Sequence, residues 1–144
     1  MRRKMNKEAG LLLDTHTLIW FVSGCEKLNP KGLQAIESAI KQRTVYLSAI
    51  SFWEIAMLAK KQRIILNEPI LSWLKKAIKI LGLRILEISP EVAVESIDLP
   101  GESHGDPADR MIIATARLYE LKLVTRDAKI LEYARAKYLQ IIEI

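Results

Sequence analysis

The sequence contains a single cysteine, Cys25, which has no partner for an intramolecular disulfide or a cysteine zinc site. It contains two histidines, His16 and His104, and this excludes a histidine-rich metal cage. The 6 glycines form neither a GxGxxG run nor a Walker-type phosphate loop, so a glycine-rich nucleotide site is not expected. With so little Cys and His, any metal ligands would be oxygen atoms.

Long hydrophobic runs are also missing. No apolar stretch approaches the roughly 20 residues that span a bilayer, and Asp14 and His16 interrupt the stretch behind the basic start. The 144 residues fit one domain with a mostly aliphatic core, since hydrophobic residues make up 50% of the chain and aromatic residues 6%. We expect a cytoplasmic protein without membrane association, with residues 1–10 as a flexible tail.

The charge balance is mildly basic. Lys and Arg number 22 against 17 Asp and Glu, a net charge of +5. This excess permits a polyanionic partner such as RNA, but many proteins that bind no nucleic acid share it.

Short apolar runs alternate with stretches of helical spacing along the chain. The three leucines at 11–13 are typical of a strand buried on both faces, and Pro30 and Pro69 mark helix starts. The pattern predicts an α/β fold with a mostly parallel central sheet of four to five strands between helices. Strands are expected at 11–13, 44–47, 83–88, 121–125 and 139–144. Helices are expected at 17–22, from 30, from 48 or 51 to 61, and at 69–81, 90–99, 106–120 and 127–136.

Acidic residues stand at the ends of expected strands or in the first turns of the helices that follow. They are Asp14, Glu54, Asp106, Asp109 and Asp127. In a parallel sheet every strand-to-helix turn lies at the same edge, where open α/β sheets place their chemistry. We therefore expect these acids to meet in one crevice.

Taken singly, each acid also fits a structural role. Ser51 and Glu54 have capping-box spacing, and Asp106 and Asp127 can cap the helices they precede. If the acids act only as caps, the chain is a non-catalytic RNA-binding or receiver-like module. An aspartyl-phosphate phosphatase is disfavoured, because Asp14 is not followed by a second Asp two positions later.

Taken together, crowded carboxylates repel one another and raise each other's pKa, and a cation removes this cost. An all-oxygen ligand set selects Mg²⁺ or Mn²⁺ over zinc. Such an ion clamps a phosphate oxygen and lowers the pKa of bound water, which indicates metal-assisted phosphodiester hydrolysis.

Four segments carry a resemblance to a known family. They are LLLDTHTLIW at 11–20, SAISFWEIA at 48–56, HGDPADRMIIATA at 104–116 and LVTRD at 123–127. In this order they resemble the four motifs of PIN-domain ribonucleases, and within that family the VapC toxins of toxin–antitoxin pairs. The resemblance implies that residues 11–144 form a single PIN domain, a three-layer α/β/α sandwich.

The resemblance also implies site residues and partners. Asp14, Glu54, Asp109 and Asp127 match the four family acids and are expected to be catalytic and to bind Mg²⁺ or Mn²⁺, with Thr125 and Asp106 in support. The expected activity is cleavage of RNA by water, leaving 5′-phosphate and 3′-hydroxyl ends. The expected partners are the RNA substrate, a VapB-like antitoxin and a second copy of the chain.

Other side chains remain open to two interpretations. Trp20 and Trp53 can stack on bases, but core packing is favoured because both lie in apolar runs. Arg110 and Arg126 adjoin expected site acids and can contact phosphate or form solvated ion pairs. The two histidines are not needed for the chemistry described.

Overall fold

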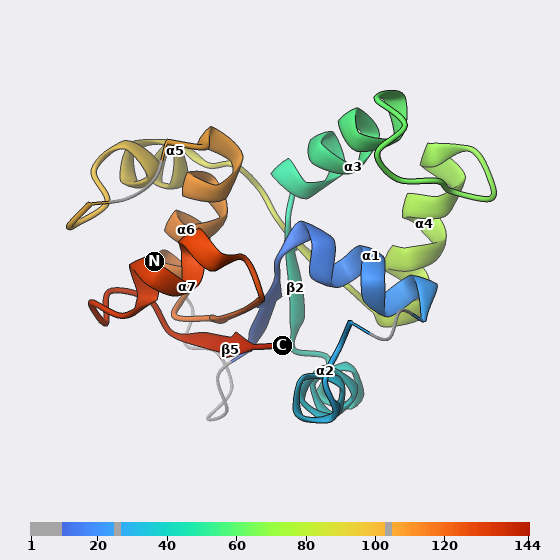
Figure 1. Ribbon diagram of the computed structural model, residues 1–144, viewed down its shortest axis with the longest axis horizontal. Helices are drawn as coiled ribbons and strands as arrows, with labels where there is room; N and C mark the ends of the chain where they lie inside the picture. Colours follow the sequence, from blue (N-terminus) through green and yellow to red (C-terminus); the bar gives the residue numbers. More distant parts are fainter. Residues whose placement is uncertain (1–9, 25–26, 103–104) are drawn as a thin grey trace.

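The computed structural model describes residues 10–24, 27–102 and 105–144. Within them, five strands form one sheet in the order β3-β2-β1-β4-β5, and every neighbouring pair is parallel (Figure 1). The strands are β1 (Leu11–Leu13), β2 (Val45–Ser48), β3 (Arg84–Leu86), β4 (Lys122–Thr125) and β5 (Ile141–Glu143). This confirms the predicted α/β class with a parallel central sheet.

Seven helices connect these strands in the described part of the chain. They are α1 (Thr15–Ser23), α2 (Pro30–Gln42), α3 (Ile50–Lys60), α4 (Ile70–Leu81), α5 (Pro90–Ile97), α6 (Pro107–Tyr119) and α7 (Ala128–Ala134). Local signals explain several of their ends. The Asn29 side chain accepts a hydrogen bond from the Gly32 N–H at 2.7 Å at the start of α2. Gly82 ends α4 in the left-handed conformation, with φ 61°.

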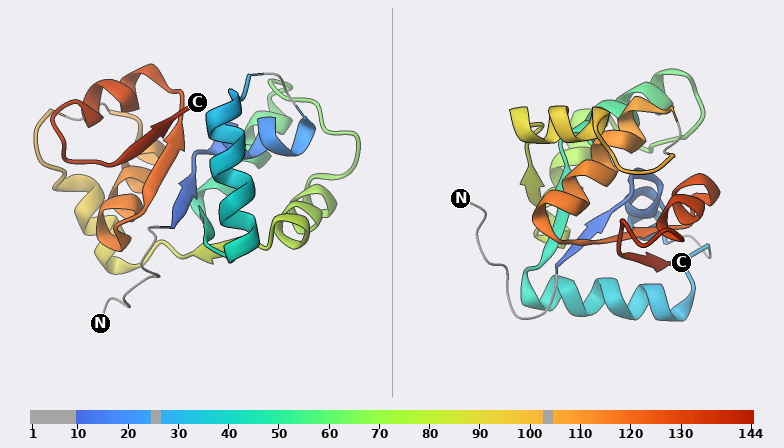
Figure 2. Two further views of the ribbon diagram at one scale, coloured as in Figure 1. Left: turned by 90° about the horizontal axis from the view of Figure 1, so that it is seen from below. Right: turned by 90° about the vertical axis from the view of Figure 1, so that its left-hand side faces the viewer.

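The helices lie in two layers on opposite faces of the sheet (Figures 1 and 2). Leu11 and Leu13 point into one apolar cluster, which α1 to α4 complete, whereas Leu12 points into a second cluster formed with α5, α6 and α7. All three leucines are buried, so β1 is covered on both faces as its sequence predicts. The result is the expected three-layer α/β/α sandwich with β1 at its centre.

Two predicted helix starts are wrong by a few residues. Helix α1 begins at Thr15 rather than at residue 17, because Asp14 already caps its first turn. Helix α3 begins at Ile50, between the two predicted starts, and the Ser48 hydroxyl accepts from the Ile50 N–H at 3.2 Å. The capping box predicted from Ser51 and Glu54 is wrong, because both residues lie inside the helix. Ser51 instead lies inside the helix and is fully buried.

The sequence places residues 1–10 in a flexible tail, and residues 1–9 lie outside the described residues. Gly10 differs from that expectation. It is buried, and its carbonyl accepts a hydrogen bond from the Lys122 N–H at 3.0 Å, which extends the pairing of β1 with β4. In the described residues, no helix combines the length and hydrophobicity needed to cross a membrane.

The packing around Gly10 yields a stability prediction. A Cβ atom at this position would lie 2.7 Å from a ring carbon of Tyr46 and 3.1 Å from the Thr44 carbonyl. Because Tyr46 is buried, Gly10→Ala overpacks the core and should lower the free energy of unfolding by about 1–3 kcal/mol. Thermal unfolding should therefore show a Tm lower by roughly 3–10 °C.

Gly105→Ala is the matched control, because a Cβ atom at Gly105 would meet nothing within 4 Å. Its Tm should stay within about 2 °C of the wild-type value. Equal shifts for the two variants would contradict the close packing of Gly10.

Candidate active site

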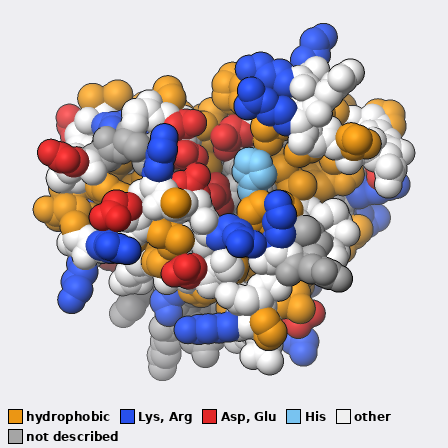
Figure 3. Space-filling model, viewed as in Figure 1, with side chains coloured by type: hydrophobic (Ala, Val, Ile, Leu, Met, Phe, Trp, Pro, Cys, Tyr) orange, Lys and Arg blue, Asp and Glu red, His pale blue; other side chains and the backbone are white. Residues whose placement is uncertain are grey.

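The acidic residues of the four motifs lie at the carboxyl edge of the sheet, where the chain changes direction. Strand β1 pairs with β2 on one side and with β4 on the other, so α1 leaves the sheet at the switch point of the topology. The Asp14 N–H donates to the Val124 carbonyl at 3.1 Å and holds the first acid at this junction. Figure 3 shows acidic side chains gathered in the middle of this face, with a histidine beside them and Lys and Arg side chains around them.

Asp14 is the most buried of these acids, with 7% of its surface exposed. One carboxylate oxygen accepts from the Thr15 N–H at 2.8 Å and caps α1. The other accepts from the Thr125 hydroxyl at 2.7 Å. Because the Thr125 oxygen also accepts from the Asp127 N–H at 3.0 Å, one side chain links the first motif to the last.

Glu54 is held by contacts between α1 and α3. Its carboxylate accepts a hydrogen bond from the Thr15 hydroxyl, which lies 2.8 Å from the buried Ser51 hydroxyl. Glu54 therefore makes a tertiary contact instead of capping its own helix. The roles of Thr15 and Ser51 were not predicted from the sequence. Their signal was a hydroxyl directly after one acid and three residues before another.

The remaining acids stand at the starts of α6 and α7. Asp106 caps α6 by accepting from the Asp109 N–H at 3.1 Å, and Asp109 lies in the first turn. Asp127 caps α7 by accepting from the Lys129 and Ile130 N–H groups at 2.9 and 3.1 Å. Capping thus accounts for one oxygen of Asp106 and one of Asp127, and it fixes how both carboxylates are oriented.

Burial and mutual repulsion perturb three of the acids. Burial, together with the nearby charges of Asp14, Asp106 and other carboxylates, raises the pKa of Asp109 to about 8. Burial also raises the pKa of Asp14, against the opposing effect of the Thr125 hydrogen bond. Burial raises the pKa of Glu54 in the same way, opposed by the Thr15 hydroxyl. Each shift includes repulsion from Asp127, so the charges of all four motifs act on one another.

The donor set fits a hard divalent cation. In the described part of the chain, no three side chains of Asp, Glu, His or Cys are spaced to hold a metal ion by themselves. Mg²⁺ is usually bound through one or two carboxylates and keeps several of its waters, so it does not need a complete protein cage. Carboxylates whose ionised forms repel one another favour a cation that neutralises them.

The tryptophan and arginine side chains near the acids differ in burial and in contacts. Trp53 is 58% exposed, so its predicted core packing is wrong, whereas Trp20 is half-buried against the core. Arg110 donates to the carbonyls of Ser96 and Ile97 at 2.8 and 3.1 Å, which ties α6 to α5. His104 lies outside the described residues.

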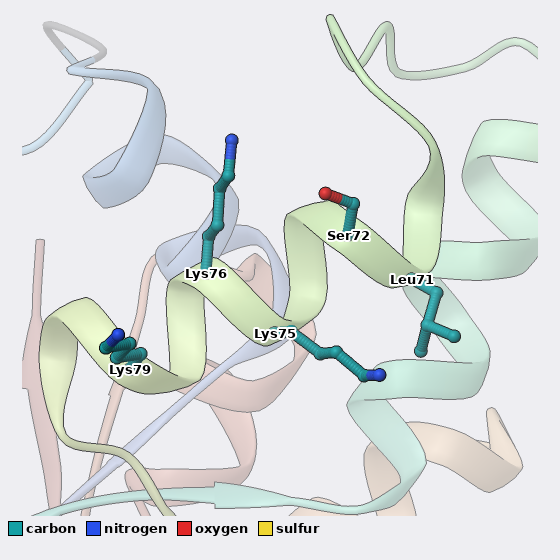
Figure 4. Close-up of a pocket in the computed structure, with 5 residues that line it drawn as sticks. All are labelled: Leu71, Ser72, Lys75, Lys76 and Lys79. Atoms are coloured by element: carbon teal, nitrogen blue, oxygen red, sulfur yellow. The ribbon is translucent and has the colours of Figure 1, made fainter.

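Two pockets lie away from the acids. One, of about 430 Å³, is lined only by side chains of α4: Leu71, Ser72, Lys75, Lys76 and Lys79 (Figure 4). Its side chains project in different directions from one helix, and Lys76 pairs with Glu68 at 3.1 Å. The other, of about 680 Å³, is lined by residues between Ala59 and Ile70. Neither pocket is lined by an acid of the four motifs.

The fold and the site together define a class: a parallel α/β/α protein with clustered carboxylates at the switch point of its sheet. The chain belongs to the PIN domain family, which it matches over residues 11–136. It is 39% identical over 120 residues to Ribonuclease VapC22 of Mycobacterium tuberculosis (strain ATCC 25618 / H37Rv), covering 83% of this chain and 88% of that protein.

Solved structures give the same fold. A crystal structure of DNA-bound VapBC from Salmonella typhimurium aligns with a TM-score of 0.67 at 20% identity, covering 94% of this chain and 98% of the other. A structure of FitAB bound to an IR36 DNA fragment aligns with a TM-score of 0.62 at 26% identity, covering 92% and 94%.

The raised pKa of Asp109 predicts a pH-dependent loss of stability in the metal-free protein. Its pKa is 3.8 when unperturbed and about 8 in the fold, so between these values the folded state retains a proton that the unfolded state has lost. Stability should therefore fall as the pH rises from about 4 to 8. Asp109→Asn removes this titration, and at pH 8 in EDTA it should raise the Tm by about 2–4 °C, equivalent to about 1 kcal/mol.

Glu37→Gln, which removes an exposed carboxylate from α2, should leave the Tm and its pH dependence unchanged. Adding a divalent cation at pH 8 should stabilise the wild type more than Asp109→Asn. An Asn variant less stable than the wild type at pH 8 in EDTA would refute the repulsion among the acids.

Proposed function

We propose that this protein is a divalent-metal-dependent endoribonuclease that hydrolyses RNA to 5′-phosphate and 3′-hydroxyl ends and acts as the toxin of a VapBC-type pair. Its membership of the PIN family and its 39% identity to a ribonuclease support this function. The observation that carries the proposal is the convergence of Asp14, Glu54 and Asp109 at one sheet edge, each with a raised pKa. A cluster that costs stability indicates selection for chemistry instead of for folding.

We further propose that Asp14, Glu54, Asp109 and Asp127 hold Mg²⁺ or Mn²⁺, with Thr125 and Asp106 in support. When bound, the ion would supply a water of lowered pKa and stabilise the charge that develops on the phosphate. Asp14 is oriented for this role by Thr125 and the Thr15 N–H, and Glu54 by the Thr15 hydroxyl. Asp127 is oriented by the start of α7 and is suited either to hold an ion or to orient the attacking water.

The capping-only alternative fits some of the acids but not all. Asp106 and Asp127 do cap helices. Glu54 does not, because its carboxylate accepts from Thr15 on another helix. A role limited to capping therefore leaves the position and the raised pKa of Glu54 unexplained.

We also propose a domain organisation, an oligomeric state and a protein partner. Residues 11–144 act as one PIN domain in the cytoplasm, as a homodimer that a VapB-like antitoxin silences. Exposed apolar side chains on three helices support such contacts: Trp53 on α3, Leu71 and Ile80 on α4, and Val94 and Ile97 on α5. Large apolar side chains that remain exposed on a helix offer a surface that a protein partner can cover.

Purified, antitoxin-free protein should cut RNA in a total-RNA preparation with Mg²⁺ or Mn²⁺ but not with EDTA. Asp14→Asn and Asp109→Asn should each lower the cleavage rate by roughly 10²-fold or more, by analogy with other charge-stabilising groups. Mapping of the product ends should give 5′-phosphates.

The control for this experiment is Glu37→Gln, which should cut at the wild-type rate. A folded, metal-loaded wild type that cuts no RNA would overturn the proposed activity. Cleavage that survives Asp14→Asn would overturn the proposed site.

Thr125→Val tests the support given to Asp14. The variant keeps the shape of the side chain but removes the hydroxyl, so Asp14 loses a buried hydrogen bond and its pKa should rise further. At neutral pH the cleavage rate should fall about 10-fold and recover partly as the pH is raised. Thr125→Ser retains the hydroxyl and should cleave within about 2-fold of the wild type, whereas equal losses in both variants would mean that packing alone matters.

A further inference from the structure

Two cationic side chains lie against one aromatic ring beside the acids. The Lys27 ammonium is 4.9 Å from the centre of the Trp20 ring, and the Arg126 guanidinium is 5.6 Å from it. Arg126 also donates to the Lys27 backbone carbonyl at 3.0 Å, so the two segments are joined directly. We call Trp20, Lys27 and Arg126 the Trp20 rim.

Residues of the Trp20 rim lie on the same segments as the acids of the candidate site. Arg126 is the residue between Thr125, which bonds Asp14, and Asp127. Trp20 lies on α1, the helix that Asp14 caps, and its ring centre is 5.6 Å from that of the exposed His16. Both cations are exposed, so an incoming molecule can reach them.

The charges of the rim are not neutralised within the described residues. In the part of the chain that the structure describes, neither Lys27 nor Arg126 forms an ion pair with an acid, whereas Arg117 pairs with Glu95 at 2.8 Å. Contact with the indole ring orients each cation without neutralising it. Two like charges brought to one ring repel each other, and an anion that binds them relieves that repulsion.

We propose that the Trp20 rim binds backbone phosphates of a single-stranded RNA segment next to the bond that is cut. This inference rests on the proposed ribonuclease function and adds where the substrate lies. A carboxylate cluster repels a polyanion, so RNA needs cations beside the acids to approach them. RNA fits the rim better than an acidic protein segment does, because the exposed His16 ring beside Trp20 also offers a base a surface for stacking.

The test separates binding from cleavage. The Asp14→Asn variant with Mg²⁺ is titrated with a fluorescent single-stranded RNA oligonucleotide at several salt concentrations, and binding is read by anisotropy. Each phosphate contact contributes about 0.7 to the slope of log K against log salt. Adding Lys27→Gln and Arg126→Gln should therefore lower the slope by about 1.4 and weaken binding at low salt by about 10–30-fold.

The matched control removes two charges from the opposite edge of the sheet. Lys41 lies in the last turn of α2, before β2 begins, and Lys122 starts β4, and both are exposed. Lys41→Gln with Lys122→Gln should leave the slope within about 0.3 of the Asp14→Asn value. An unchanged slope for the rim variant, or equal losses in both double variants, would overturn the inference.

Cleavage by the wild type and by the two double variants without Asp14→Asn distinguishes failure of the rim inference from failure of the proposed ribonuclease activity. If wild-type protein cuts RNA but the rim variant retains the full salt slope, the rim inference fails alone, and an acidic protein partner becomes the better occupant. If the wild type cuts nothing but the slope falls as expected, the rim binds RNA and the proposed activity fails.

Discussion

The structure depends on how one buried carboxylate is held. Asp14 sits where the central strand ends, with a backbone N–H on one oxygen and the Thr125 hydroxyl on the other. These bonds join β1, α1 and β4 at a single point. An unpaired carboxylate buried this deeply would be strongly destabilising, so the hydroxyl of Thr125 and the cap of α1 make its position tolerable. The remaining acids approach this fixed group from α3, α6 and α7.

The fold tolerates this cluster because its stability comes from elsewhere. Leu12 and Leu13 are fully buried on opposite faces of β1, each in its own apolar layer. The acids occupy the edge of the sheet, where the raised pKa values of Asp109 and Glu54 oppose folding. This division, with an apolar centre that stabilises and an acidic edge that destabilises, is expected of a site that a bound cation completes.

Charge is also distributed unevenly around the edge. The chain as a whole carries +5, yet acidic side chains gather in the middle of the face in Figure 3, with basic side chains around them. Arg126 directly precedes Asp127 in the chain, and both Arg126 and Lys27 contact the Trp20 ring. A face with a negative centre and a positive border suits a polyanion that must be held on both sides of one reacting phosphate.

The sequence by itself determined the parallel α/β class, the buried central strand and which acids would meet. Each follows from local pattern: uniform leucines for β1, proline and glycine at helix ends, and one edge shared by all strand-to-helix turns. Tertiary structure alone decided what each acid contacts. The sequence shows a hydroxyl directly after Asp14, but it does not show that Thr15 would donate to Glu54 on another helix, because that contact depends on how α1 and α3 pack. Likewise, Trp20 meets Arg126 only because β4 lies beside β1, a pairing between distant parts of the chain.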